Sequence, residues 1–372
     1  MRFRSPAQPC TAGPSFRLEL LESRQFLSAG HNFGQFFVQT NLVSDSQIAA
    51  SAAHTDPNLK NPWGLASSPT GPWWVANNHT AMSTIYDNSG NTFLPAVQVP
   101  GAGGATGNPT GIVFNGGSEF QISANGKSGP ARFIFVNEDG LISGWNSQVD
   151  SAHAVPSGAI SQAGASYKGV TLAQFAGNTY LYAADFHNGD IAIFDSSFHS
   201  VTMPGSFTDS KLPAGFAPFN VQNVGGHVFV TYAMQDADKA DEVAGAGLGY
   251  VDEYSAGGKL MQRFQTGSFM NAPWGVVQAP KGFGKFTGDI LIGMFGSGQI
   301  AAFNAQNGKF QELLRDVHDK PIQIDGLWAL RFGNNGVAGD DHTLFFTAGI
   351  NDEDDGLFGT LTLNHGKPKS RG

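Results

Sequence analysis

Oxygen-bearing side chains recur at two kinds of position in this sequence, just before one short apolar run and just after the next. Positions of the first kind hold Asn61, Asn108, Asn220, Asn271 and Asp325. Positions of the second kind hold Asn78, Glu138, Asp185, His187 and Asp352. Amide and carboxylate oxygens are the ligands of hard cations such as Ca²⁺, which takes about six to eight of them. Whether these side chains act together depends on the elements that carry them.

The apolar runs belong to an internal repeat, which "NPWGLA" at Asn61 and "NAPWGVV" at Asn271 show most clearly. The anchor residues of the six copies are Gly64, Gly111, Gly169, Asn220, Gly275 and Ala329. Successive anchors lie 47 to 58 residues apart, and runs rich in β-branched and aromatic residues follow each one. Four short strands in a unit of about 40 to 50 residues are typical of a propeller blade. The sequence therefore predicts an all-β fold, a six-bladed β-propeller of four-stranded antiparallel blades.

The two ends of the repeat array complement each other. The sixth unit ends after its third strand, near Leu361, and an extra strand-like segment, "GQFFVQTNLVSD" from Gly34, precedes the first anchor. Pairing the two removes the exposed edges of an open sheet, so we predict that the N-terminal strand closes the last blade. The predicted organisation is a leader or export segment over 1–33, a single propeller over 34–364 and a disordered tail over 365–372.

This blade geometry brings the two sets of polar residues together. The innermost strand begins at the face to which the loop between the second and third strands returns, so both sets share one mouth of the central channel. We predict that this mouth is polar and acidic. Asn61 and Asn108 each precede a proline, and the alternative there is an asparagine that caps its own turn. His187 beside Asp185 is interpreted either as a base or as a polar surface residue of a turn.

Aromatic and acidic residues complete the set of features at the predicted mouth. Large aromatic residues precede four of the anchors, at Trp63, Phe219, Trp274 and Trp328. One interpretation is packing between neighbouring blades, and the other is stacking of a sugar or another ligand. Two acidic segments, "DADKADE" from Asp236 and "NDEDDG" from Asn351, lack the spacing of an EF-hand loop. They are interpreted as solvated loops.

Composition and missing motifs exclude several classes of protein. The net charge of −9 argues against binding of nucleic acid, which requires lysines and arginines to neutralise phosphates. Cys10 is the one cysteine, so neither an intrachain disulfide nor a cysteine zinc site can form. No run of about eighteen apolar residues is present, so no membrane span is expected. The G-x-S-x-G and H-E-x-x-H motifs of common hydrolases are also missing.

Several short phrases resemble those of known proteins. "NLVSD", "DPNLKNPWG", "PWWVANN" and "IDGLW" are similar to phrases of a family of uncharacterised bacterial six-bladed β-propeller proteins, and the likeness spans Asn41 to Leu363. The blades are more distantly similar to NHL-repeat and gluconolactonase-like propellers. The gluconolactonase-like proteins place a divalent metal at the channel mouth with one Glu, two Asn and one Asp. That resemblance implies that Glu138, Asn108, Asn220 and Asp325 are ligands of Ca²⁺ or another divalent cation.

The N-terminal segment "LELLESRQFLSA", which begins at Leu18, resembles the LEPR-XLL leader motif of exported planctomycete proteins. It implies a protein of the cell surface, the periplasm or the extracellular space, and the alternative is an amphipathic helix or a disordered tail. The first functional hypothesis is a non-catalytic, monomeric propeller whose mouth binds a small molecule, a saccharide or a protein. The second is a divalent-metal-dependent hydrolase or lactonase. The third is a purely structural surface component.

Overall fold

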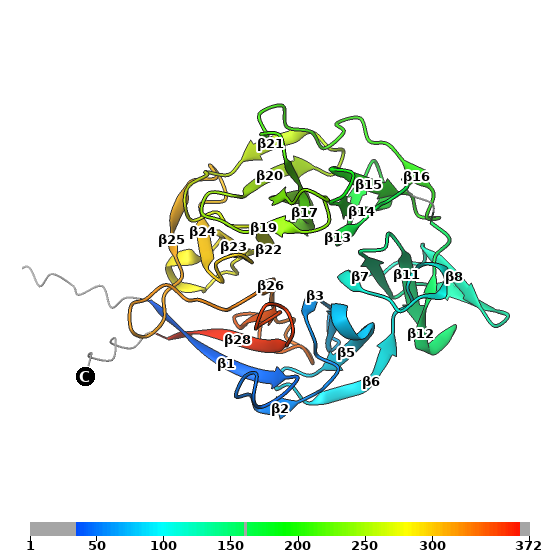
Figure 1. Cartoon of the computed structure of the whole chain (residues 1–372), viewed down its shortest axis with the longest axis horizontal. Helices are drawn as coiled ribbons and strands as arrows, with labels where there is room; N and C mark the ends of the chain where they lie inside the picture. Colours follow the sequence, from blue (N-terminus) through cyan, green and yellow to red (C-terminus); the bar gives the residue numbers. More distant parts are fainter. Residues whose placement is uncertain (1–34, 160–161, 365–372) are drawn as a thin grey trace, which may run out of the picture. The chain divides into compact units, whose positions relative to one another are not determined.

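The described part of the chain folds into six blades of antiparallel strands around one axis. The computed structural model describes residues 35–159 and 162–364, and the predicted leader (1–33) and tail (365–372) lie outside these ranges. Figure 1 shows the sheets arranged as the blades of a propeller, with the first strand of each blade toward the centre. The predicted fold, an all-β six-bladed β-propeller with four strands in each blade, is confirmed.

The first three blades follow the repeat. Blade 1 consists of β3 (Pro62–Ser67), β4 (Trp73–Asn77), β5 (Met82–Tyr86) and β6 (Thr92–Gln98). Blade 2 consists of β7 (Pro109–Phe114), β10 (Phe133–Asn137), β11 (Ile142–Asn146) and β12 (Asp150–Pro156), with an inserted hairpin of β8 (Gln121–Ala124) and β9 (Lys127–Pro130). Blade 3 consists of β13 (Tyr167–Phe175), β14 (Asn178–Asp185), β15 (Asp190–Phe194) and β16 (Ser200–Val201).

The other three blades complete the ring. Blade 4 consists of β17 (Phe216–Val224), β18 (His227–Gln235), β20 (Tyr250–Ser255) and β21 (Leu260–Arg263), with β19 (Glu242–Val243) paired to β18. Blade 5 consists of β22 (Pro273–Gln278), β23 (Ile290–Met294), β24 (Ile300–Phe303) and β25 (Phe310–Leu313). Blade 6 consists of β26 (Leu327–Phe332), β27 (Leu344–Ala348), β28 (Leu357–Asn364) and β1 (Phe36–Ser44), with β2 (His54–Thr55) beside β1. Short 3₁₀ turns are η1 (Asn78–Thr80), η2 (Ala102–Gly104) and η3 (Gly284–Phe286).

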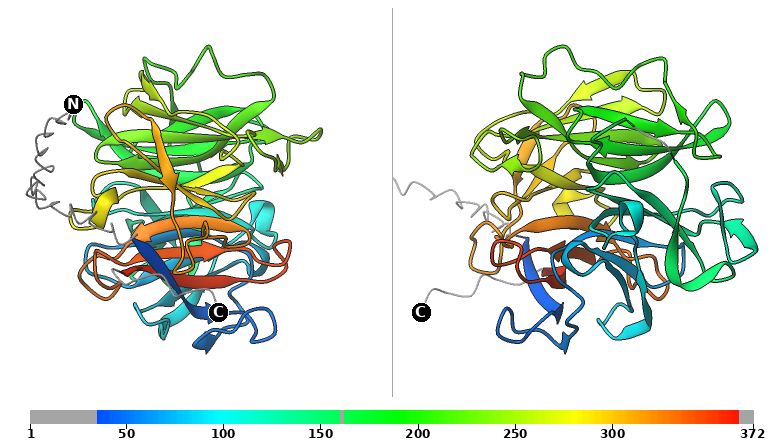
Figure 2. Two further views of the ribbon diagram at one scale, coloured as in Figure 1. Left: turned by 90° about the vertical axis from the view of Figure 1, so that its left-hand side faces the viewer. Right: turned by 45° about the vertical axis from the view of Figure 1, so that its right-hand side comes forward.

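The N-terminal strand closes the last blade, as the sequence predicts. β1 runs antiparallel to β28 from the pair Phe36 and Asn364 to the pair Ser44 and Leu357, with a register shift after Asn41. Figure 2 shows the two strands side by side. Because β1 covers the edge of β28, that strand does not present a row of unpaired backbone groups to solvent.

Successive inner strands contact one another all the way round, from β3 through β7, β13, β17, β22 and β26 back to β3. Small anchor residues allow this close approach. A Cβ atom at Gly64 would lie 2.7 Å from the Thr110 carbonyl oxygen, and one at Gly275 would lie 2.6 Å from the Trp328 carbonyl oxygen. Real Cβ atoms do not come so near to backbone atoms, so glycine is required at these two anchors.

The axis is filled by a cluster of aromatic rings that we call the aromatic plug: Trp63, Phe186, Phe219, Trp274, Phe295 and Trp328. The Trp63 and Trp328 rings stack with centroids 3.6 Å apart, and Trp63 also contacts Phe219 at 6.3 Å. Trp63 comes from blade 1 and Phe219 from blade 4, which are separated by two blades on either side. The interpretation that these aromatic residues pack between neighbouring blades holds for the contacts of Trp328 with Trp63 and Trp274, which come from adjacent blades, and the contact of Trp63 with Phe219 shows that the rings also meet across the axis. No helix within the described ranges is both long enough and apolar enough to cross a membrane.

Candidate functional site

A buried lysine lies at the mouth of the channel where the inner strands begin. Lys168 occupies in blade 3 the position that Trp63 occupies in blade 1, directly before the anchor. Its residue surface is 1% exposed, and its ammonium group lies over the Trp63 ring, 5.2 Å from the centroid. The Lys168 Nζ bonds to the Glu138 carboxylate and lies 3.3 Å from the Asp241 Oδ1. The positive charge of Lys168 therefore lies against a ring of the aromatic plug.

Lys168 is an ammonium ion at neutral pH. Burial opposes its charge, but the carboxylates of Glu138, Asp241 and Glu242 outweigh burial and raise the pKa of Lys168 above its ordinary value. A lysine that acts as a nucleophile needs the opposite shift, toward the neutral amine. The geometry therefore assigns Lys168 an electrostatic role.

Glu138 connects Lys168 to two of the asparagines predicted from the sequence. Its Oε2 accepts a hydrogen bond of 2.9 Å from the Asn78 Nδ2 and a longer one of 3.4 Å from the Asn108 Nδ2. Asn78 also donates to the Asn108 carbonyl oxygen at 3.3 Å. Loops of blades 1 and 2 and the inner strand of blade 3 thus share one hydrogen-bonded network.

A second carboxylate, Glu353, reaches the mouth from the loop between β27 and β28. The Asn61 Nδ2 donates to the Glu353 Oε2 at 2.5 Å and lies 3.4 Å from the His79 Nε2. The Asn61 Oδ1 accepts a hydrogen bond of 3.0 Å from the Trp328 Nε1. Asn61 and Asn108 both use their side chains across the mouth, so the alternative that they cap their own turns is wrong.

Two of the carboxyl groups have pKa values above the ordinary range of glutamate. Burial, together with Glu353 and Asp241, raises the pKa of Glu242 to about 8 despite the nearby ammonium of Lys168. Burial, with Glu138 and Asp241 nearby, likewise raises the pKa of Glu353. We call the group of Glu138, Asp241, Glu242, Glu353 and Lys168 the acidic mouth. It holds four carboxyl groups and a single ammonium, and it carries an excess of negative charge whenever these groups ionise.

Asp185 and His187 do not join this group. The buried Asp185 carboxylate accepts hydrogen bonds from the backbone N–H groups of Ser166 at 3.2 Å and Asn188 at 3.1 Å, and from the Asn188 Nδ2 at 2.8 Å. It therefore holds the turn between β14 and β15. In the described part of the chain, no hydrogen bond joins the half-buried His187 ring to Asp185, so a paired base is not formed.

The other predicted residues are engaged elsewhere. The Asn220 Nδ2 donates to the Trp274 carbonyl oxygen at 2.8 Å, and the Asn271 Oδ1 accepts from the Gly245 N–H at 2.6 Å. Asp325 is exposed and accepts from the Asn351 N–H at 2.8 Å. Asp352 is exposed as well, in the loop between β27 and β28.

The four residues that the gluconolactonase-like resemblance implies do not fit a shared metal ion. Glu138 is paired with the Lys168 ammonium, which a divalent cation would have to displace or repel. The Asn220 amide is bonded to inner-strand backbone, and no hydrogen bond links Asp325 to Glu138 or Asn108 among the described residues. We therefore derive no chemical step through a metal at this mouth.

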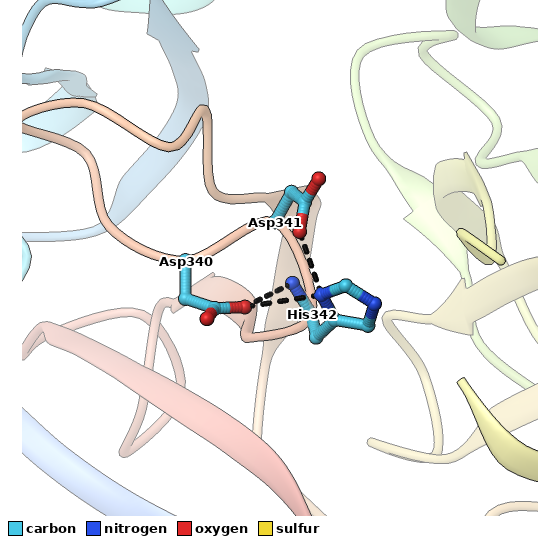
Figure 3. A group of neighbouring side chains, drawn as sticks. All are labelled: Asp340, Asp341 and His342. Atoms are coloured by element: carbon cyan, nitrogen blue, oxygen red, sulfur yellow. Dashed lines mark hydrogen bonds and ion pairs between the residues drawn. The ribbon is translucent and has the colours of Figure 1, made fainter. Parts of the chain in front are cut away.

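A different acidic cluster lies in the loop between β26 and β27. In Figure 3 the carboxylates of Asp340 and Asp341 both point at the Nδ1 of His342, at 3.2 and 2.6 Å. The His342 Nε2 lies 2.9 Å from the Lys281 carbonyl oxygen, which needs a proton on that nitrogen. The hydrogen bond to Lys281 and the two carboxylates raise the pKa of His342 above its ordinary value, so this turn favours the imidazolium form.

Comparison with known proteins places the chain among viral relatives. It is 30% identical to the uncharacterized protein R648 of Acanthamoeba polyphaga mimivirus over 316 residues, which is 83% of this chain and 76% of the relative. It is 31% identical to the uncharacterized protein L690 of the same virus over 330 residues, 86% of this chain and 84% of the relative. This chain belongs to the family of R648 and L690.

Membership of the R648 and L690 family supplies no activity, since neither relative has one in its name. No family model matches the chain, and the resemblance to a bacterial propeller family stays a prediction. Among solved structures, an α-L-arabinofuranosidase, Arb93A from Fusarium graminearum, matches with a TM-score of 0.53 and 11% identity, over 88% of this chain and 98% of that one. At that identity the likeness shows a common fold alone.

Sequence reasoning missed five residues of the mouth: Lys168, His79, Asp241, Glu242 and Glu353. One signal was present, because a lysine stands at a repeat position that holds an aromatic residue in four other blades. Glu242 and Glu353 lie in the two acidic segments interpreted as solvated loops. That interpretation holds for their exposed neighbours Asp238 and Asp352, whereas Glu242 and Glu353 are half-buried.

Proposed function

We propose that this protein is a ligand-binding β-propeller whose acidic mouth captures an organic cation, such as the primary amine or guanidinium group of a small molecule. The observation that carries the proposal is the imbalance of charge at the mouth. Glu138, Asp241, Glu242 and Glu353 share one ammonium, and burial raises the pKa of Glu242 to about 8, an effect that the nearby Lys168 ammonium does not offset.

A bound cation would supply that counter-charge. Ammonium and guanidinium groups form charge-assisted hydrogen bonds with carboxylates, and these bonds are stronger where water is partly excluded. A positive charge beside Glu242 and Glu353 favours their ionised forms and lowers their pKa values. Binding near neutral pH is therefore coupled to proton release.

The test is calorimetric titration of the protein at neutral pH with putrescine and with arginine amide, in two buffers of different ionisation enthalpy. We expect binding whose apparent enthalpy differs between the buffers, because protons leave Glu242, whose pKa is raised to about 8. The variant Glu242→Gln keeps the shape of the side chain and should reduce the number of protons released. A matched control is Asp340→Asn, which removes an exposed carboxylate from a loop outside the mouth.

Failure of both cations to bind the folded protein would refute the proposal. The same titration with Ca²⁺ alone tests the second hypothesis, a divalent-metal-dependent hydrolase or lactonase. Stoichiometric Ca²⁺ that is lost in the Glu138→Ala and Asp325→Ala variants would replace an organic cation with a metal at this mouth.

Export of the protein to the cell surface, the periplasm or the medium is part of the proposal and rests on the segment at Leu18–Ala29 alone. Fractionation of cells that express the full chain, with N-terminal sequencing of the protein recovered, tests it. Full-length protein found in the cytoplasm alone would contradict export.

A further inference from the structure

A second pocket lies at the other end of the channel, where the inner strands end. It has a volume of about 320 Å³. Residues from the inner strands of five blades line it, among them Ser67, Phe114, Thr171, Gln222, Arg331 and Phe332. The aromatic plug is near the beginnings of the same strands, so it separates this pocket from the acidic mouth. We call this second site the Arg331 pocket.

The guanidinium of Arg331 lacks an anionic partner. Its Nε donates a hydrogen bond of 3.2 Å to the Leu65 carbonyl oxygen. No ion pair joins Arg331 to a carboxylate within residues 35–159 and 162–364. Burial lowers the pKa of Arg331 to about 10, and no acidic neighbour offsets this effect.

A buried amide points to the same place. Gln222 is 8% exposed and lines both the Arg331 pocket and a cavity of about 10 Å³ deeper in the channel. Its side-chain amide makes no hydrogen bond with the described residues. Thr171 adds a hydroxyl group that accepts from the Asn223 N–H at 3.0 Å and so has its own O–H available to donate. Apart from the bonds of Arg331 to Leu65 and of Asn223 to Thr171, these three side chains make no hydrogen bond within the described residues, so their remaining donors are available to a molecule in the pocket.

The composition of the pocket selects the class of ligand. A guanidinium presents N–H groups in a planar fork that matches the two oxygens of a carboxylate. The rings of Phe114 and Phe332, with Leu172, add apolar walls that an inorganic anion would leave uncovered. We propose that the Arg331 pocket binds a small organic monocarboxylate, with its carboxylate on Arg331 and its remaining atoms against these walls. Gln222 and Thr171 donate further hydrogen bonds to it.

This site is independent of the proposed function. The acidic mouth attracts cations, whereas the Arg331 pocket attracts an anion at the opposite end of the inner strands. Loss of one activity therefore leaves the other measurable.

The test is calorimetric or NMR titration of the wild-type protein with benzoate, and with benzamide as the neutral analogue of the same shape. We expect benzoate to bind at least about tenfold more tightly than benzamide. Arg331→Gln should weaken benzoate binding by about tenfold or more, and Arg331→Lys by less because it keeps the charge without the planar fork. Glu242→Gln, in the acidic mouth, should leave benzoate binding unchanged.

Three results would overturn the proposal: equal affinities for benzoate and benzamide, benzoate binding that persists in folded Arg331→Gln, or binding of sulfate without binding of benzoate. The first and third are measured on the wild-type protein, so they test the proposal even if a variant fails to fold. Circular dichroism of each variant establishes that it is folded before its titration is interpreted.

Discussion

Lys168 places a positive charge where four other blades place an aromatic ring, and this single substitution within the repeat organises the acidic mouth. An unpaired buried ammonium would be strongly unfavourable, and the Glu138 carboxylate removes that penalty. Glu138 is in turn held by Asn78 and Asn108. Lys168, Glu138, Asn78 and Asn108 are therefore joined by an ion pair and hydrogen bonds, whereas Glu242 and Glu353 form no ion pair within the described residues.

Glu242 gives a prediction about pH. Its folded-state pKa is raised from 4.5 to about 8, so the folded state binds the proton more tightly than the unfolded state does. Ionisation of Glu242 therefore reduces stability progressively as the pH rises from 4.5 to about 8. Glu242→Gln removes this loss. We expect the variant to match the wild type near pH 4 and to exceed its free energy of unfolding by about 1–3 kcal/mol above pH 8.

Urea unfolding of both proteins at the two pH values measures this difference. Asp238→Asn is the control, since Asp238 is an exposed carboxylate of the same loop and should change stability equally little at both values. A gain in Glu242→Gln that does not depend on pH would contradict the assigned pKa.

At the scale of elements, the sequence was sufficient to predict where the inner strands lie and insufficient to predict the paths of the loops. The repeated anchors predicted each inner strand, and the extra segment from Gly34 predicted that β1 pairs with β28. Glu242 and Glu353 could not be placed in the same way, because the two-residue strand β19 and the loop between β27 and β28 that carry them follow no periodic pattern. The short strand β19, which carries Glu242 onto β18, has no counterpart in the other blades. Its pairing is a local addition that a repeat alignment does not reveal.

The closing strand gives the second prediction. Phe37 in β1 is 1% exposed and packs on Phe283 and Phe286, with ring centroids 5.3 and 6.0 Å away. Phe37→Ala removes these contacts and loosens the strand that covers β28. We expect a loss of about 3–5 kcal/mol in the free energy of unfolding, measured by urea denaturation.

Val38→Ala is the matched control for Phe37→Ala, because Val38 lies on the same strand and is 37% exposed. Its expected cost is about 0.5 kcal/mol or less. If the two variants lost the same stability, β1 would not close the ring through the packing of Phe37.

Over the whole molecule, the aromatic plug makes five of the six blades depend on one another. Its rings come from blades 1, 3, 4, 5 and 6, and they bury the axis between the acidic mouth and the Arg331 pocket. The sequence placed a large ring at four anchors but did not reveal that the rings meet, because side-chain directions at the axis follow from blade tilt. The same limitation hid Arg331, which in sequence is an ordinary residue near the end of a strand.

Trp328 gives the last prediction, which concerns cooperativity. It is fully buried, stacks on Trp63 at 3.6 Å and on Phe295 at 4.1 Å, and donates to Asn61. Trp328→Ala should lower the free energy of unfolding by about 3–5 kcal/mol. Phe93→Ala, at a ring that is 47% exposed, should lower it by about 0.5 kcal/mol or less. Because the plug joins opposite sides of the ring, the wild type should lose its near-ultraviolet and far-ultraviolet circular dichroism in one coincident transition. Loss of the aromatic signal at a lower urea concentration than the strand signal would show that the plug packs locally, and that the blades do not need it to hold together.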